Sequence, residues 1–209
     1  MSFFQNTDRE KYLTSQNEEE IQKKWLVFPE HFHNQGIQEN IRNSKEEQYQ
    51  EGFLRDLFEK VLGYTLNPSP EFNLTTEYKN IKDAKKADGA IIINNQVKAV
   101  IELKGTDTTD LNKVEAQAFG YKNNQPDCKY VIISNFEKLR LYVDNAIEHL
   151  EFNLFDLTKN DFKNLYVCLA YNNLQRDLAE KIKQESVSKE SDITKQLYKE
   201  YYNVKAALF

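Results

Sequence analysis

The segment from Ala87 to Lys104, ADGAIIINNQVKAVIELK, constrains the fold more than any other part of the chain. Two apolar runs stand on either side of a short asparagine-rich turn, and this pattern is typical of an antiparallel hairpin. Asp88 opens the first run, while Glu102 and Lys104 end the second. Charged groups at the end of a buried strand are costly unless something pairs with them. The hairpin therefore predicts a place where two carboxylates and a lysine meet.

The alternation of side chains along the second strand decides which of these groups are neighbours. It puts four residues on one face, namely Lys98, Val100, Glu102 and Lys104, and four on an apolar face, namely Val97, Ala99, Ile101 and Leu103. A three-residue loop, Asn94-Asn95-Gln96, would set Ile93 opposite Val97 and Asp88 opposite Glu102. A two-residue loop would shift the pairing by one and move Asp88 to the other face. We expect the three-residue loop.

Composition limits the classes of protein to which the chain can belong. Its 209 residues can bury a core, and 12 Tyr and 13 Phe argue against disorder. No apolar run approaches the roughly 20 residues of a membrane helix, and the first residues lack the pattern of a signal peptide. Cys128 and Cys168 are the only cysteines, which favours a reducing cytoplasm. The net charge of −5 does not indicate nucleic-acid binding and does not exclude it.

Residues 1–62 are predicted to be helical. Ile21, Trp25 and Phe28 recur at helical spacing, and Pro29 is expected to end or kink that helix. A second apolar stripe, made of Phe53, Leu54, Leu57, Phe58, Val61 and Leu62, stops at Gly63. Extended backwards, this stripe reaches Glu46, Glu47 and Gln50, so an acid approaches the inward face. The alternative is that these glutamates only favour the helix dipole.

Residues 64–80 are expected to form a loop with a short strand. After the hairpin, Asp110 is placed to cap a helix that runs to about Tyr121. The segments KYVIIS, LRLYV and LEFNL are predicted strands, and a helix follows at about 161–170. A polar break at 186–191 precedes a last helix whose apolar stripe is Ile193, Leu197, Tyr201, Val204 and Leu208. That stripe indicates a connector to something outside this chain, or else a helix that packs back on the core.

The residue types of the hairpin suit metal-assisted hydrolysis. Mg²⁺ prefers hard oxygen ligands and usually takes one or two carboxylates, which Asp88 and Glu102 would supply. Lys104 could orient a water or neutralise a phosphate in the transition state. Glu47 is the acid expected to complete the metal shell from the preceding helix. His31 and His33 form an H-x-H pair, but no other ligands follow nearby, so a metal role is not expected for them.

Two further residues extend this pattern. Gln117 and Tyr121 lie at i and i+4 on the helix after the hairpin, from which they could reach a phosphate or the surroundings of Lys104. The order Asp88, Glu102-x-Lys104 and Gln117-x-x-x-Tyr121 resembles the PD-(D/E)XK nuclease superfamily in its RecB-like branch, with Ala87 at the place of the usual proline. The segments EEQYQEGFLRDLFEKVLGY, KKADGAIII, VIELKG and CKYVIISNFEKLRLYV are similar to the N-terminal endonuclease domain of type IIG restriction–modification enzymes.

The resemblance implies a fold, a function and partners. It implies an α/β (α+β) restriction-endonuclease-like αβββαβ core with a mixed central sheet flanked by helices. Residues 1–43 would form an N-terminal helical segment, 44–175 the nuclease core, and 176–209 a helical connector toward a methyltransferase domain. The catalytic residues would be Asp88, Glu102 and Lys104, together with a helix glutamate that is Glu47 or the adjacent Glu46.

The implied activity is Mg²⁺-dependent hydrolysis of double-stranded DNA, with Mn²⁺ as a substitute metal. Linked methyltransferase and target-recognition domains, S-adenosylmethionine bound only in those domains, and transient dimerisation for double-strand cleavage are also implied. Two alternatives remain open. The chain could be the nuclease domain of a type I restriction motor subunit, or a catalytically silent nuclease fold used as a scaffold module.

Overall fold

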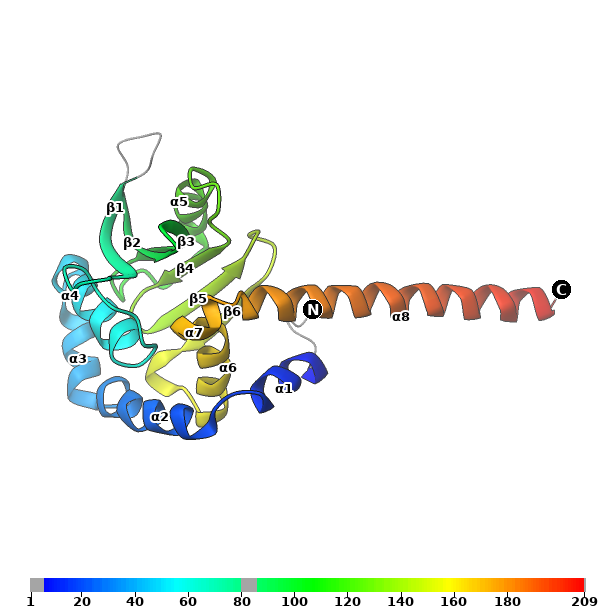
Figure 1. The fold of residues 1–209 in the computed structure, drawn as a ribbon, viewed down its shortest axis with the longest axis horizontal. Coiled ribbons are helices and arrows are strands. Elements are labelled where there is room, and N and C mark those ends of the chain that lie inside the picture. The colour runs from blue at the N-terminus through cyan, green and yellow to red at the C-terminus, as the bar shows by residue number, and fades with distance from the viewer. Residues whose placement is uncertain (1–5, 80–85, 209) are drawn as a thin grey trace.

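A single mixed sheet organises the protein. The computed structural model describes residues 6–79 and 86–208 (Figure 1). Its strands are β1 (Leu74–Lys79), β2 (Lys86–Ile93), β3 (Gln96–Leu103), β4 (Tyr130–Ser134), β5 (Lys138–Val143) and β6 (His149–Asn153). They lie in the order β1-β2-β3-β4-β5-β6, and only the β3–β4 pair is parallel. Helix α5 (Asn112–Asn123) makes the connection between these two strands. The predicted α/β fold with a mixed sheet and flanking helices is confirmed.

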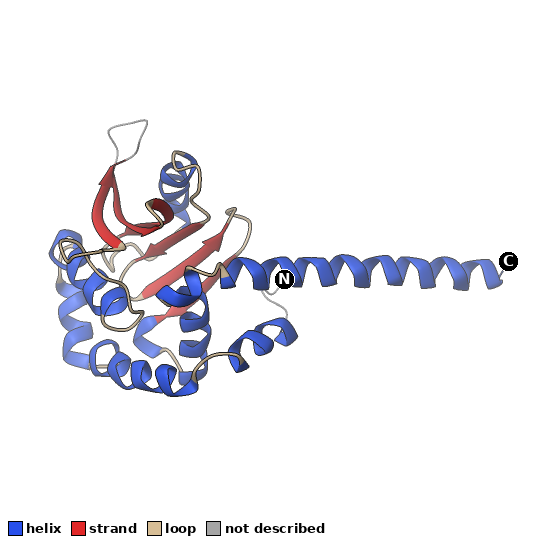
Figure 2. Cartoon of the chain, viewed as in Figure 1, coloured by secondary structure: helices blue, strands red, loops and turns tan. Residues whose placement is uncertain are grey.

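Helices cover both faces of the sheet (Figure 2). One face packs against α5 through a small apolar cluster that includes Ala90, Val100, Val114 and Ala118. The other face carries the main core and most of the remaining helices. These are α1 (Asn6–Thr14), α2 (Glu18–Phe32), α3 (Gln35–Asn43), α4 (Glu46–Phe53), α6 (Lys159–Leu169), α7 (Tyr171–Leu174) and the start of α8 (Leu178–Leu208), with the short 3₁₀ turn η2 (Leu154–Asp156).

The N-terminal helices belong to this main core. Ile21, Phe28, Phe32 and Ile41 are buried in the same apolar cluster as Ile101 of β3. Helix α2 continues through Pro29 to Phe32, so Pro29 does not end the helix, which was one of the two expected outcomes. Proline removes one backbone hydrogen bond from the helix, while the rings of Phe28 and Phe32 are fully buried and stack with centroids 4.8 Å apart, which favours the helical conformation.

Helix α4 continues directly into η1 (Leu54–Glu59), a segment with the wider π-helical turn. The six residues of the predicted stripe from Phe53 to Leu62 are all buried. Gly63 follows with a φ of 82°, a left-handed conformation in which glycine is favoured. The predicted helix and its stop at Gly63 are therefore confirmed.

The hairpin of β2 and β3 differs from the prediction in two places. Ile93 pairs with Gln96 across a two-residue turn, Asn94-Asn95, in which both residues have positive φ (52° and 61°). The expected three-residue loop is therefore wrong. A β-bulge then shifts the register between Ile91 and Ile92, because Ile92 pairs with Val97 while Ile91 pairs with Ala99. Beyond the bulge Gly89 pairs with Ile101, so Asp88 and Glu102 come next to one another, as expected.

The bulge also changes the faces of the first residues of β3. Val97 packs in the α5-side cluster with Val100, and not with Ala99, Ile101 and Leu103 as predicted. Lys98 is the extra residue of the bulge, and its Nζ contacts Asp177 Oδ2 at 2.9 Å. Lys98 therefore does not share the face of Glu102 and Lys104.

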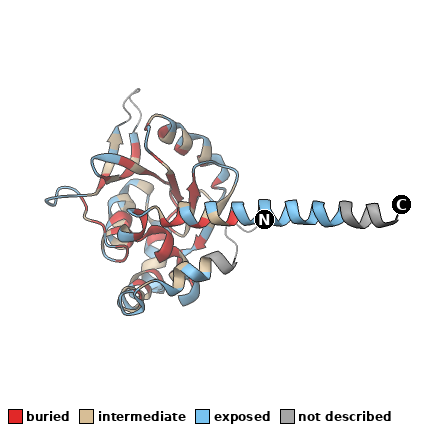
Figure 3. Ribbon diagram, turned by 45° about the vertical axis from the view of Figure 1, so that its right-hand side comes forward, coloured by how far each residue is buried: buried red, intermediate tan, exposed pale blue. Residues whose placement is uncertain are grey.

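Helix α8 leaves the body of the protein (Figures 1 and 3). It runs without a break, so the predicted interruption at 186–191 is wrong. Ile193, Leu197 and Tyr201 of the predicted stripe are 54%, 61% and 62% exposed, and the side chains of Val204 and Leu208 lie outside the described residues. The helix does not pack back on the core over its exposed part. Among the described residues, we find no helix with the length and apolar character needed to cross a membrane.

Candidate active site

The ends of β2 and β3 bring Asp88, Glu102 and Lys104 together. The backbone amide of Leu103 donates to Asp88 Oδ2 at 2.7 Å, which ties the first carboxylate to the strand that carries the other two groups. Lys104 Nζ donates to Glu102 Oε1 at 2.7 Å. The Lys104 amide in turn donates to the Ser134 carbonyl of β4 at 2.8 Å, so the last residue of the motif is anchored to the parallel strand.

Glu102 is the most buried charged residue of this group. Only 1% of it is exposed, and its Oε1 accepts hydrogen bonds from Lys104 and from Gln117. Its Oε2 is buried without a hydrogen-bond partner. Burial, reinforced by the charge of Asp88, raises the pKa of Glu102 to about 7. Glu102 is therefore a carboxyl group that lacks enough partners for its charge.

Burial and neighbouring charges also shift the pKa values of Asp88 and Lys104. Burial raises the pKa of Asp88, although the Leu103 amide opposes the change. Burial alone would lower the pKa of Lys104, but its hydrogen bond to Glu102 and the nearby acids raise it. Lys104 therefore stays a cation beside two carboxyl groups that resist ionisation.

The acid from α4 that approaches this cluster is Glu46. Its Oε1 lies 3.6 Å from Lys104 Nζ, and it accepts a hydrogen bond from Gln50 (3.1 Å). Glu47 is exposed, and both Glu46 and Glu47 line a polar pocket of about 410 Å³ together with Arg42, Lys45 and Thr106 among others. The structure thus corrects the expected position of Glu47, since Glu46 is the neighbour of Lys104.

Gln50 contributes to the site although the sequence pattern gave it no role. It lies one turn after Glu46, to which it donates, and its side-chain amide lowers the pKa of the Asp88 carboxyl against the effect of burial. The only sign of this in the sequence is its spacing from Glu46, because i and i+4 share one face of a helix.

Gln117 and Tyr121 of α5 lie beside Glu102. Gln117 Nε2 donates to Glu102 Oε1 at 2.6 Å and to the Tyr121 hydroxyl at 3.2 Å. Gln117 therefore contacts the glutamate directly and Tyr121 contacts Gln117, while no hydrogen bond among the described residues joins either side chain to Lys104.

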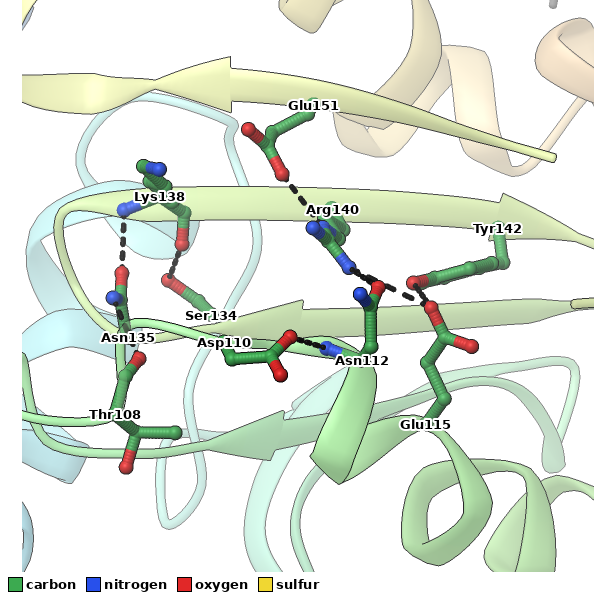
Figure 4. A network of polar contacts seen from close by, with 10 residues as sticks. All are labelled: Thr108, Asp110, Asn112, Glu115, Ser134, Asn135, Lys138, Arg140, Tyr142 and Glu151. Atoms are coloured by element: carbon green, nitrogen blue, oxygen red, sulfur yellow. Dashed lines mark hydrogen bonds and ion pairs between the residues drawn. The ribbon is translucent and has the colours of Figure 1, made fainter.

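A polar network holds the loop and the helix that follow β3 (Figure 4). The Asn135 side chain donates to the Thr108 carbonyl at 3.0 Å, which fixes the loop against the β4–β5 turn. Asp110 accepts from the Asn112 amide at 3.1 Å but is not the N-cap residue that the sequence predicted, because Leu111 occupies that position. Arg140 of β5 reaches Asn112 and Glu115, the first turn of α5.

The donor set fits a hard divalent cation. Asp88 and Glu102 offer carboxylate oxygens, and the unpartnered Oε2 of Glu102 is a buried acceptor that a cation would satisfy. Within the described ranges, no group of three or more Asp, Glu, His or Cys side chains stands ready to hold a metal ion. Mg²⁺ needs no such cage, because it commonly keeps several waters and takes one or two carboxylates.

The histidines and cysteines lie elsewhere. His31 Nε2 lies 2.7 Å from the Tyr49 hydroxyl and 3.2 Å from Asp56 Oδ2, while His33 packs edge-on against the Trp25 ring. The two histidines therefore face different partners. Both cysteines are buried free thiols.

Comparison with known proteins places the chain in a family. The family model described as "MmeI, N-terminal domain" matches residues 7–197. The chain belongs to the MmeI N-terminal domain family. The resemblance to the N-terminal domain of type IIG restriction enzymes is thereby confirmed, and it is favoured over the type I motor subunit. The match includes the helices before residue 44, in agreement with their place in the main core.

Other comparisons add little. A search of curated proteins found no match. One solved structure, described as "cryoEM structure DrdV-DNA complex", aligns with 73% of this chain at 15% identity and a TM-score of 0.44. The aligned part is 14% of the length of that chain.

Proposed function

We propose that the chain is the DNA-cleaving domain of a type IIG restriction–modification enzyme and that it hydrolyses phosphodiester bonds with Mg²⁺, or with Mn²⁺ in its place. The observation that supports this most is the meeting of Asp88, Glu102 and Lys104 at the ends of two strands, with one buried oxygen of Glu102 left unpartnered. A structural ion pair would use both oxygens of a buried glutamate, because an unsatisfied buried acceptor is costly.

Each residue has a distinct part in this proposal. Asp88 and Glu102 would hold the cation. When bound, Mg²⁺ supplies a Lewis acid that polarises the phosphate and lowers the pKa of a water ligand. Lys104 is held by Glu102 within reach of the same place, so its ammonium can orient a water or offset the negative charge that develops on the phosphate. Gln117 fixes the orientation of Glu102, and Glu46 adds a carboxylate near Lys104.

We also propose that the chain is part of a longer protein and that this protein acts in the cytoplasm. Double-stranded DNA is the proposed substrate, and a linked methyltransferase and target-recognition module, with S-adenosylmethionine in the former, would supply sequence recognition. One such site cuts one strand, so transient dimerisation is proposed for double-strand cleavage. Helix α8, which projects with an exposed apolar stripe, is the proposed connector.

Metal binding by this chain tests the first step. Calorimetric titration with Mn²⁺ and Mg²⁺ should show binding by the wild type and its loss in Asp88→Ala. Asp192→Ala, which removes an exposed carboxylate on α8, is the matched control and should bind as the wild type does. Equal binding by all three proteins would exclude Asp88 as a ligand.

Cleavage tests the second step and requires the full-length protein with its cognate DNA. Lys104→Ala should reduce the cleavage rate by about 10²- to 10³-fold, the usual cost of removing a group that stabilises transition-state charge. A Lys104→Ala protein that cuts as fast as the wild type would make the assignment wrong. Metal binding without any cleavage by the wild type would favour the silent scaffold instead.

A further inference from the structure

Arg140 holds the first turn of α5 from across the sheet. It lies on β5, two strands from β3, a distance of about 10 Å at the usual strand spacing. Its Nε donates to Glu151 Oε2 at 2.6 Å, and Glu151 is its direct pairing partner on β6. Its Nη1 donates to Asn112 Oδ1 at 2.7 Å and lies 3.5 Å from Glu115 Oε1 (Figure 4). The guanidinium thus joins the edge of the sheet to a helix.

The start of α5 depends on these contacts. Leu111, at the position before the helix, makes no side-chain capping bond, so the first turn is held by Asp110, which accepts from the Asn112 amide, and by the side chains of Asn112 and Glu115. The Tyr142 hydroxyl adds a hydrogen bond to Glu115 Oε1 at 2.5 Å. Only 13% of the Arg140 side chain is exposed, so its ion pairs are less screened by solvent than those of surface arginines.

Gln117 lies five residues after Asn112 on the same rigid helix, or about 7.5 Å along its axis. Its side chain donates to Glu102 Oε1 at 2.6 Å, and a hydrogen bond of that length is sensitive to small shifts of the helix. The chain of contacts therefore runs from Glu151 through Arg140 to the first turn of α5, and from Gln117 to Glu102.

We propose that Arg140 is a positioning residue of the active site, which acts through α5 to hold the Gln117 amide on Glu102. The effect of Arg140 on metal binding rests on the proposed function, whereas the structural link from Arg140 to Gln117 does not. Arg140 touches no reacting group. Loss of a partner that orients a metal ligand typically weakens metal affinity or activity by about 10- to 100-fold.

The structural link can be tested without any metal. In ¹⁵N spectra of the whole chain, the side-chain amide resonance of Gln117 is assigned by its absence in Gln117→Leu. Arg140→Met should shift that resonance toward the position of a free glutamine amide. Lys163→Met, which removes a cation that joins α6 to Glu18 of α2, is the matched control and should leave it in place.

Arg140→Met removes the cation that pairs with Glu115 and Glu151, and this variant could fail to fold. Asn112→Ala is the second variant, because Asn112 is exposed and its loss removes a single hydrogen bond between Arg140 and the helix. Helix α5 still packs through Val114, Ala118 and Tyr121, so the resonance of Gln117 should shift in a folded protein. An unchanged Gln117 resonance in a folded Asn112→Ala or Arg140→Met protein would overturn the inference.

Calorimetry with Mn²⁺ then tests the consequence. We expect Arg140→Met and Gln117→Leu each to weaken binding by about tenfold, and the double variant to bind no more weakly than Gln117→Leu alone, because both changes remove one interaction. A double variant whose loss equals the product of the two single losses would show that Arg140 affects metal binding independently of Gln117, which would contradict the inference. If the Gln117 resonance shifts as expected but the wild type binds no metal, the proposed function fails and the link from Arg140 to Gln117 stands.

Discussion

The raised pKa of Glu102 predicts that a neutral residue at this position stabilises the metal-free protein. Between pH 4.5, the ordinary value for a glutamate, and about 7, the folded state binds a proton on Glu102 that the unfolded state has released. The free energy of unfolding therefore falls as the pH rises through this window. The full loss above pH 7 is up to about 3 kcal/mol, given 1.36 kcal/mol for each pH unit.

Glu102→Gln keeps the shape of the side chain and removes its charge. At pH 8 we expect the variant to be about 1 to 3 kcal/mol more stable than the wild type, the lower figure allowing for the weaker hydrogen bond that a neutral amide makes with Lys104. At pH 4.5 the gain should vanish, because the wild-type carboxyl is then protonated in the folded state.

Urea denaturation in the presence of a chelator measures both values. Glu190→Gln, at an exposed position on α8, is the control and should follow the wild type at every pH. The reasoning is refuted if Glu102→Gln is no more stable than the wild type at pH 8, or if its advantage is the same at pH 4.5 and pH 8. The second result would mean that the gain comes from packing and not from the charge.

Three other predictions follow from the same structure. Because a metal must displace the proton of Glu102, Mn²⁺ affinity should rise with pH up to about 7 and then level, and calorimetry in buffers of different ionisation heat should detect the released proton; binding that is independent of pH would contradict this. Phe28→Ala should lower the urea unfolding free energy by about 3–5 kcal/mol, since Phe28 is fully buried in the main core, and a loss below about 1 kcal/mol would show that α2 is not part of it. Leu197→Asp should change that free energy by less than about 0.5 kcal/mol because Leu197 is 61% exposed, whereas a larger loss would indicate that α8 packs on the body in solution.

Patterns that depend on a single element could be predicted from the sequence. The apolar stripe from Phe53 to Leu62 fixes a helix face by itself, and the strands around Asp88 and Glu102 follow from uninterrupted apolar runs. Helix α8 shows the limit of such patterns. The polar segment at 186–191 contains neither glycine nor proline, so its cost in a helix is small for each residue and the helix continues through it.

The acid of α4 could not be settled by pattern because the helix changes its pitch. The apolar stripe that pointed to Glu46 and Glu47 lies mostly in η1, where the turn is wider than in an α-helix. A face extrapolated from η1 therefore drifts before it reaches the first turn of α4. Within α4 itself, Glu46, Gln50 and Phe53 fall at i, i+4 and i+7, and Phe53 is fully buried. Leu54, at i+7 from Glu47, is fully buried as well, so spacing does not separate the two acids, and the contact of Glu46 with Lys104 decides between them.

The position of Asp88 shows how two unpredicted features can cancel. A two-residue turn at Asn94-Asn95 would, alone, place Asp88 on the face opposite Glu102. The bulge at Lys98 inserts one residue into β3 and restores the register beyond it, so that Asp88 meets the Leu103 amide. The same bulge turns Lys98 toward Asp177 at the base of α8. The turn and the bulge therefore set the register together. A chain with only one of them would keep the hairpin but would place Asp88 and Glu102 on opposite faces of the sheet.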